Sequence, residues 1–396
     1  MKVEQLKTLL ASVLSEVTGK TDLTTEDLQN LIDVGTTAVG NGVDNYVKSL
    51  VNHIGKVIFV NRPYMGNVPS VLMDSWEYGS ILEKISTDLL AAEENDTWNL
   101  VDKKQYSQDT FYKPTVTAKF FNSKTTFEIP LSITERQVKE SFSSAEQLNG
   151  FVSMLYNAVE KSISVYFDGL IMRTINSMTA RTLASETTAF GESGSQDYGK
   201  GSTAKAINLL YLYNKTVESP IKAEDAIYDP QFIRFASYIM NLTADRMKTI
   251  NTAFNIGGKQ RFTPSDMLHT VLLSDFAAAA KTYLYSDTFN AEDVLLPKAE
   301  TVSSWQGTGT GFDFKSVSSI DVKIGETDTV KASGILGVMF DRDALGVTNL
   351  DRRVTSTYNA KAEFFNNFFK FEAGFFNDTD ENFVVFYVAE QASEAA

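Results

Sequence analysis

An uninterrupted helical pattern in residues 145–181 constrains the fold of this chain more than any other feature. Its apolar positions recur three to five residues apart without a proline: Leu148, Phe151, Leu155, Val159, Ile163, Tyr166, Leu170 and Ile175. Ser144 and Gln147 have the spacing of a capping box at its start. About 35 residues at roughly 1.5 Å each make a rod of about 50 Å, whereas a typical helix has about 11–12 residues. The pattern therefore predicts a structural axis, with an ordinary long core helix as the simpler alternative.

Phenylalanine is concentrated near the other end of the chain, in residues 359–388. Several of these rings share one phase of a two-residue alternation whose other phase is charged: Phe365, Phe369, Phe371 and Phe375. This alternation predicts a half-buried strand. After the acidic turn NDTDEN, residues 383–388 (FVVFYV) are apolar in both phases and are expected inside a sheet. The rings are therefore most simply explained as core.

The charge and hydropathy of the chain exclude two further roles for these rings. The net charge is −14 at pH 7, and such a surface repels phosphate. Carboxylates also outnumber lysines within residues 359–388, whereas a base-stacking platform needs a basic groove. The longest apolar run, residues 383–389, is far shorter than the about 20 residues that span a bilayer. We therefore expect neither a nucleic-acid platform nor a membrane segment.

The N-terminal residues and the lack of cysteine bear on the cellular compartment. Glu4, Lys7 and Glu16 interrupt the first apolar positions, so no signal peptide is predicted. A chain without cysteine is not a disulfide-built secreted scaffold. We expect a soluble intracellular protein.

No motif for catalysis or cofactor binding emerges. The glycine-rich residues 307–312 (GTGTGF) lack the helix and the Lys-Ser/Thr pair of a phosphate loop. Asp341 and Asp343, within residues 341–346 (DRDALG), have no cluster of further metal-ligating residues beside them in the sequence. This segment is more simply explained as a turn at the end of a strand. His53 and His269 have no nucleophile or paired carboxylate nearby in the sequence and are expected to be satisfied structural residues. We expect no enzymatic activity, no metal and no cofactor; an α/β hydrolase that uses one of these histidines is the enzyme alternative.

Two segments before the long helix are predicted to project from a compact core. An apolar stripe near the N-terminus marks either a helical pair with its own core or an arm on a neighbouring subunit; it comprises Val3, Leu6, Leu10, Val13 and Val17. Residues 113–131 are predicted to form two strands around a tight turn at Asn122 and Ser123. A long excursion with the acidic stretch AAEEND precedes them, so we expect an extended hairpin.

A mixed α/β portion follows the long helix. Asp229 and Pro230 predict the N-cap and first residue of one helix, and HTVLLS and residues 317–322 have the pattern of short strands. The sequence thus predicts an α+β protein whose elements run in the order arm, hairpin, long helix, α/β portion and aromatic strands.

This order resembles the major capsid protein of tailed bacteriophages, the Hong Kong 97-like fold. Residues 50–64 (LVNHIGKVIFVNRPY) are similar to the segment before the extended loop in short-tailed phages of the phi twenty-nine group. Residues 114–162 resemble the passage from hairpin to spine helix in the same group. Residues 335–347 (ILGVMFDRDALGV) and 352–376 resemble the strand, turn and long peripheral strands of many phage capsid proteins. The resemblance covers essentially the whole chain.

The resemblance implies a domain organisation. Residues 1–55 would be the N-terminal arm, and residues 77–131 the extended loop with its hairpin at 113–131. The peripheral domain would comprise residues 56–76, 132–204 and 338–378, with the spine helix at about 145–181. The axial domain would comprise residues 205–337 and 379–396.

The resemblance also implies a function and partners. The chain would assemble with itself as hexamers and pentamers into an icosahedral or prolate phage head around double-stranded DNA, without sequence-specific contacts to that DNA. A scaffolding protein and a portal protein would be further partners, and no membrane would be involved. The expected contacts between subunits come from the arm and the hairpin: Leu6, Leu10, Val13, Lys119, Phe120, Phe121, Lys124 and Phe127. Lys119 and Lys124 are otherwise explained as exposed lysines on an edge strand. An encapsulin-like nanocompartment shell of the same fold is the alternative.

Overall fold

The computed structural model describes residues 68–73, 81–90, 92, 93, 95, 97, 99–106, 109, 111–134, 145–186, 201–285, 299–307, 313–325 and 328–390. These residues belong to two compact units. The larger unit comprises Met65–Glu128, Ile163–Arg353 and Lys370–Ala396, and the smaller one Met1–Tyr64, Ile129–Ser162 and Val354–Phe369. The arm predicted at residues 1–55 and its contacts Leu6, Leu10 and Val13 lie outside the described residues, as does His53.

A five-stranded sheet forms the centre of the larger unit. Its order is β5 (Ala206–Asn208), β13 (Phe383–Tyr387), β10 (Ile335–Asp341), β6 (Leu268–Leu273) and β7 (Ala299–Val302). β10 is antiparallel to both of its neighbours, and the two outer pairs are parallel. Every residue of β13 is buried, which confirms that FVVFYV lies inside a sheet.

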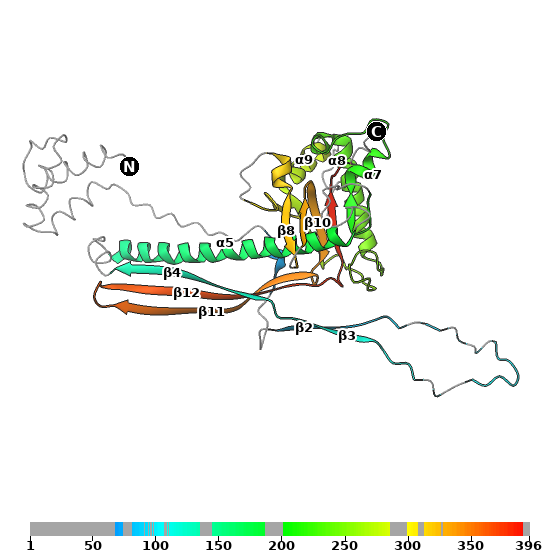
Figure 1. Ribbon diagram of the computed structural model, residues 1–396, viewed down its shortest axis with the longest axis horizontal. Helices are drawn as coiled ribbons and strands as arrows, with labels where there is room; N and C mark the ends of the chain where they lie inside the picture. Colours follow the sequence, from blue (N-terminus) through cyan, green and yellow to red (C-terminus); the bar gives the residue numbers. More distant parts are fainter. Residues whose placement is uncertain are drawn as a thin grey trace, which may run out of the picture. The chain divides into compact units, whose positions relative to one another are not determined.

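Helices pack on this sheet and complete its core. Figure 1 shows α7 (Leu209–Asn214), α8 (Pro230–Met247) and α9 (Ser274–Tyr285) beside the strands. Asp229 caps α8 by accepting hydrogen bonds from the backbone N–H groups of Gln231 and Phe232, and Pro230 is its first residue, as predicted. Two short helices, η3 (Ala226–Tyr228) and α10 (Phe314–Val317), and the hairpin β8 (Ile320–Ile324)–β9 (Asp328–Ala332) complete this part.

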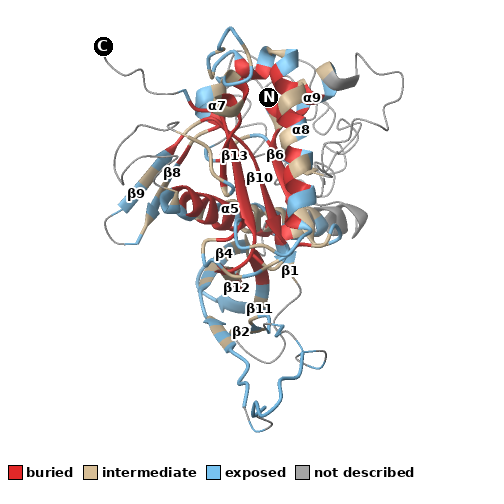
Figure 2. Cartoon of the chain, turned by 90° about the vertical axis from the view of Figure 1, so that its right-hand side faces the viewer, coloured by how far each residue is buried: buried red, intermediate tan, exposed pale blue. Residues whose placement is uncertain are grey.

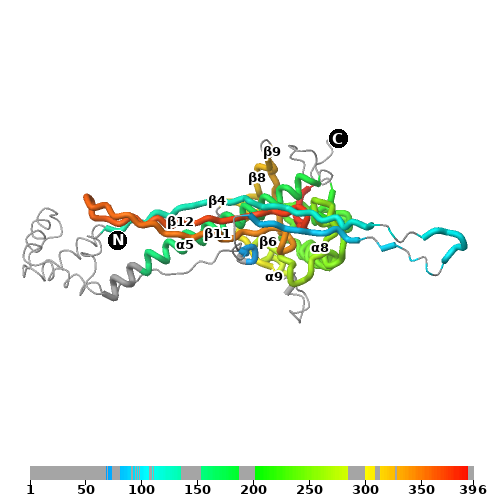
Figure 3. The backbone as a smooth tube through the Cα atoms, turned by 90° about the horizontal axis from the view of Figure 1, so that it is seen from below, coloured from blue at the N-terminus to red at the C-terminus, as the bar shows by residue number. Residues whose placement is uncertain are grey.

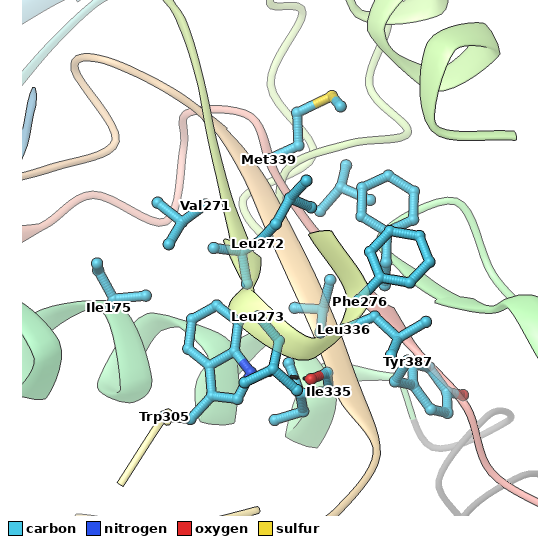
Figure 4. Packing of buried hydrophobic residues seen from close by; sticks show 14 of the residues in the cluster. Ile175, Val271, Leu272, Leu273, Phe276, Trp305, Ile335, Leu336, Met339 and Tyr387 are labelled. Atoms are coloured by element: carbon cyan, nitrogen blue, oxygen red, sulfur yellow. Dashed lines mark hydrogen bonds between the residues drawn. The ribbon is translucent and has the colours of Figure 1, made fainter. Parts of the chain in front are cut away.

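The core of the larger unit joins the sheet to the second half of the long helix. Figure 4 shows Ile175 of that helix packed with Val271, Leu273 and Trp305. The indole N–H of Trp305 donates to the backbone oxygen of Ile335 over 2.8 Å, so this buried side chain leaves no polar atom unsatisfied. Burial is concentrated in β6, β10 and β13 (Figure 2).

The long helix is confirmed: α5 spans Ala145–Ser185 without a break. It ends a few residues later than the expected boundary near 181, and its side chains are described from Ser153 onward. Four residues of the predicted apolar stripe are buried, namely Val159, Ile163, Leu170 and Ile175, whereas Tyr166 is 54% exposed. The described part of the stripe is therefore only partly covered within the subunit.

Long strands form a second sheet, with the order β1 (Leu72–Met73), β11 (Leu345–Asn359), β12 (Phe364–Asn377) and β4 (Lys124–Thr134). β11, β12 and β4 run side by side (Figure 3). Phe369 and Phe371 of β12 are buried as the alternation predicts. Phe365 is instead 43% exposed, and its ring lies 4.6 Å from that of Tyr358 within the smaller unit.

The predicted pairing within residues 113–131 is wrong, although both strands exist. β3 (Val116–Phe121) pairs antiparallel with β2 (Leu82–Thr87), while β4 joins the sheet of β12. A two-residue hairpin turn of the usual type needs positive φ at its central residues. Among the described non-glycine residues, only Lys103 and Glu363 have positive φ, so Asn122 and Ser123 do not form such a turn. The hairpin is therefore β2–β3, and residues 88–115 are its connection.

No helix in the described part of the chain is long and apolar enough to cross a membrane.

Candidate functional site

The β2–β3 hairpin has two chemically different faces. Alternation places Lys84 and Lys119 on a half-buried face, opposite each other in the ladder. The other face exposes Ile85, Val116 and Phe120, whose exposed fractions are 64%, 56% and 65%. One face is therefore anchored within its own subunit. The other is uncovered and largely apolar, with Glu83 and Thr87 as its polar members, and we call it the apolar face.

Like charges directly opposite each other destabilise a ladder, and three carboxylates compensate here. Lys84 Nζ lies 2.9 Å from Asp378 Oδ2 and 2.7 Å from Glu381 Oε1. Lys119 Nζ lies 2.9 Å from Asp378 Oδ1 and 2.6 Å from Asp380 Oδ2. We call these five residues the root cluster, because they join the hairpin to the turn after β12. Asp378, which contacts both ammonium groups, is almost fully buried.

Backbone contacts hold the turn that carries these carboxylates. The N–H of Asp378 donates to the oxygen of Ala344 over 2.7 Å, and the N–H of Gly257 donates to the oxygen of Thr379 over 2.8 Å. A Cβ at Gly257 would lie 2.0 Å from Asp380 Oδ1, so a residue without a side chain is needed there. Arg261 adds a further cation, with its Nε 3.2 Å from Glu381 Oε1.

The charge states of the cluster favour ion pairs over bond formation. Burial alone would raise the pKa of Asp378, but the hydrogen bond from Lys119 and the charge of Lys84 outweigh it and lower that pKa. Burial alone would lower the pKa of Lys119, but its hydrogen bonds to Asp380 and Asp378 raise it. Lys119 is thus held as an ammonium, which has no lone pair with which to attack a carboxyl or amide carbon.

A buried polar network lies behind the root cluster. Asp341 accepts hydrogen bonds from Thr263 Oγ1 over 2.7 Å and from the Asp343 N–H over 2.9 Å. Burial raises the pKa of Asp341 despite these bonds. Residues 342–344 form a turn after β10, which confirms the prediction of a turn at the end of a strand.

His269 does not fit the expectation of a satisfied histidine. It lies on β6 opposite Phe340, with its ring 5.9 Å from that ring, and burial lowers its pKa. Its Nε2 atom has no hydrogen-bond partner among the described residues. No nucleophile in the described ranges is hydrogen-bonded to that atom, so the geometry does not resemble a catalytic triad.

Most of the subunit contacts expected on β3 and β4 have partners in their own chain. The ring of Phe121 lies 5.2 Å from that of Phe376, and Lys124 Nζ lies 2.7 Å from Glu372 Oε1. Phe127 packs among several aromatic rings of the larger unit: Tyr166, Phe167 and Phe371. Lys119 belongs to the root cluster, so its explanation as an exposed edge lysine is wrong. Phe120 is the member of this set that presents a large uncovered ring.

Sequence reasoning missed Lys84, Arg261 and the carboxylates after β12. Two features of the sequence could have indicated these contacts. One is the run of acidic residues in NDTDEN between two apolar strands, and the other is a lysine in each of two strands with alternating polarity, LEKIST and VTAKFF. No group of acidic residues or histidines in the described ranges is placed to hold a metal ion. The carboxylates of the root cluster are occupied by lysines.

Comparison with known structures defines the class of the fold. The chain is similar to a chain of the capsid structure of Staphylococcus phage Andhra, with a TM-score of 0.54 and 10% identity over 85% of this chain and 88% of that one. It is also similar to a chain of the structure of head fiber and inner core protein gp22 of native bacteriophage P68, with a TM-score of 0.53 and 7% identity over the same shares. The fold is that of the Hong Kong 97-like phage capsid proteins.

The sequence then defines the family within this class. Residues 7–387 match the family of Phi29-like phage major capsid proteins, and the chain belongs to that family. No curated protein matches the chain. The protein is a major capsid protein of a tailed phage, and neither the encapsulin-like alternative nor the hydrolase is favoured.

Proposed function

We propose that copies of this capsid protein associate as hexamers and pentamers into an icosahedral or prolate head, and that the apolar face of the β2–β3 hairpin lies on a neighbouring copy. The observation that supports this is the exposure of Ile85, Val116 and Phe120 on one side of a ladder whose other side is anchored. Such a face gains free energy when a partner removes it from water. Each contact is small, and the closed lattice makes the sum stable.

The connection between the two strands extends the same surface. Within its described residues, large apolar side chains are exposed: Leu89, Leu90, Leu100, Val101, Phe111 and Tyr112. The hydroxyl of Tyr112 donates to Glu93 Oε2 over 3.0 Å, so part of this connection has its own hydrogen bonds. A neighbouring copy offers the continuous surface that covers such a segment.

The remaining roles follow from the family and from charge. We propose the N-terminal arm at 1–55 as a second contact, with Leu6, Leu10 and Val13 against another copy, and we retain the peripheral and axial domains with the boundaries that the resemblance implies. A scaffolding protein would guide assembly in the host bacterial cytoplasm, and a portal protein would occupy one vertex. The net charge of −14 is consistent with DNA that is driven into the head rather than attracted by it. We propose no enzymatic activity.

Assembly of the purified protein tests this proposal. Light scattering and negative-stain electron microscopy are applied to the protein alone and with a candidate scaffolding protein. We expect closed shells tens of nanometres across in at least one of these conditions. A subunit that stays monomeric in both would contradict the proposal.

A further inference from the structure

Charged side chains join the β2–β3 hairpin to the rest of the larger unit. Apart from the ladder that they share, β2 and β3 have no extensive contact with another described helix or strand. Beyond the root cluster, the joint contains the ring contact of Phe121 with Phe376 and an ion pair of Lys259 with Asp88 at 3.0 Å. The joint is thus rich in ion pairs.

The two sides of this joint differ in how they are held. The turn that carries the carboxylates is fixed by backbone hydrogen bonds to Ala344 and Gly257. The hairpin contributes two lysines, each a charge on a flexible stem with three donors. Lys84 uses a further donor toward the backbone oxygen of Asp343 over 3.1 Å. The turn is therefore the fixed part, and the hairpin is the part whose direction has to be set.

The pairing of buried charges can set the direction of the hairpin. Lys84 and Lys119 are paired across the ladder, so both ammonium groups move together with the hairpin. Asp378 is almost fully buried, and leaving a buried carboxylate unpaired is costly. Lys84 contacts one of its carboxylate oxygens, and Lys119 contacts the other. A hairpin that leaned elsewhere would break these pairs, whereas apolar contact tolerates many directions.

We propose that the root cluster is a positioning joint, in which Lys84 and Lys119 fix the direction of the hairpin and thereby the place where its apolar face meets a partner. The partner is a second copy of this chain, so this consequence rests on the proposed function. The joint itself is a property of the single subunit and is testable without assembly.

Distance measurement between two spin labels on unassembled subunits tests the joint. The chain has no cysteine, so Thr87→Cys on the hairpin and Tyr238→Cys on α8 add the only labelling sites, and both positions are exposed. We expect one narrow distance distribution in the otherwise unchanged chain. Lys119→Gln is expected to broaden it or add a second population, and Lys119→Arg, which keeps the cation, is expected to restore it. Asp380→Asn removes one carboxylate and is expected to broaden the distribution as well, but less than Lys119→Gln does.

Two controls separate positioning from general stability. Lys124→Gln removes a lysine of the same unit whose partner is Glu372, outside the root cluster, and should leave the distribution narrow. Hydrogen exchange of the β2–β3 amides should stay slow in Lys119→Gln, because the ladder persists while its direction changes. An unchanged distribution in Lys119→Gln and Asp380→Asn would overturn the proposal. Fast exchange of the ladder would also overturn it, since the cluster would then hold the strands together instead of directing them. Failure to form shells would count against the proposed function alone.

Discussion

At the scale of single residues, Gly334 shows how one position depends on backbone geometry. Its φ is +77°, and a Cβ at this position would lie 2.1 Å from the backbone oxygen of Val388. Gly334→Ala should lower the free energy of unfolding by about 1–3 kcal/mol, because the strain and the clash with a fixed backbone atom add. Denaturant unfolding of the purified subunit measures this loss.

A glycine in open space provides the control for Gly334. No heavy atom lies within 4 Å of a Cβ added at Gly169, which is inside α5. Gly169→Ala should stabilise the subunit by up to about 1 kcal/mol, because alanine is the better helix former. Equal losses in both variants would contradict this dependence on backbone geometry.

Burial of single residues could be predicted from the sequence, but their partners could not. The pattern of residues 383–388 indicated their burial in both phases, because hydrophobicity is a property of each residue. Lys119 was expected to be exposed or at a subunit contact, and its carboxylates lie far away in the chain. Residues so far apart in the sequence show no periodic pattern that would reveal their contact. His269 was expected to be satisfied, and only the structure reveals its Nε2 without a partner among the described residues.

At the scale of elements, acid should release the hairpin while the sheet remains folded. The pKa of Asp378 is lowered, so its contribution is present above the ordinary value of 3.8 and is lost as the pH falls through the folded-state pKa. Attachment should therefore be constant near neutral pH and weaken only below about 3.8. The pKa of Asp341 is raised, so its protonation in acid favours the folded sheet.

The label pair on the hairpin and α8 measures this release. In a chain that also carries Trp76→Phe and Trp98→Phe, the fluorescence of buried Trp305 reports on the core around the sheet. The distance distribution should broaden at a higher pH than the one at which the fluorescence changes. Asp378→Asn should reduce the acid dependence without abolishing it, because Asp380 and Glu381 still pair with the two lysines. Simultaneous loss of both signals in the labelled chain with Asp378 intact would contradict separate release.

Elements with a long regular pattern were predicted well, whereas strand pairing was not. α5 was recognised because its apolar stripe repeats over many turns, and the cap of α8 because Asp and Pro have fixed positions there. The strands at 116–121 and 124–134 were also recognised. Their pairing was wrong, because adjacency in the sequence favoured a hairpin while the backbone at Asn122 and Ser123 lacks the φ that a tight turn needs.

At the scale of the whole molecule, the fold class followed from the order of elements, because that order spans the chain. The family followed from segments, such as residues 50–64 and 114–162, that resemble those of the phi twenty-nine group. No single motif is specific enough to identify a capsid protein. The surface that joins copies is harder to predict, since alternation gives two faces of a strand without saying which one its own chain covers. In β2–β3 the lysine face is covered by an acidic turn from the far end of the chain, which leaves the apolar face uncovered.

Phe120 is therefore the residue through which assembly is most directly tested. Its ring is 65% exposed in the subunit, and Glu83 lies opposite it in the ladder, so a neutral polar residue is the suitable replacement. Phe120→Thr should leave the circular dichroism and thermal unfolding of the subunit unchanged, because threonine is well suited to a strand. Burying a phenylalanine contributes about 1.5–3 kcal/mol, so losing it weakens each contact at least about tenfold. Because a closed lattice repeats the contact in every copy, the yield of shells should fall sharply. Phe120→Leu keeps an apolar side chain and should retain most of the yield. Light scattering and negative-stain electron microscopy of matched preparations measure it. A normal yield with Phe120→Thr would mean that copies join through another surface, because this contact would have lost its apolar ring.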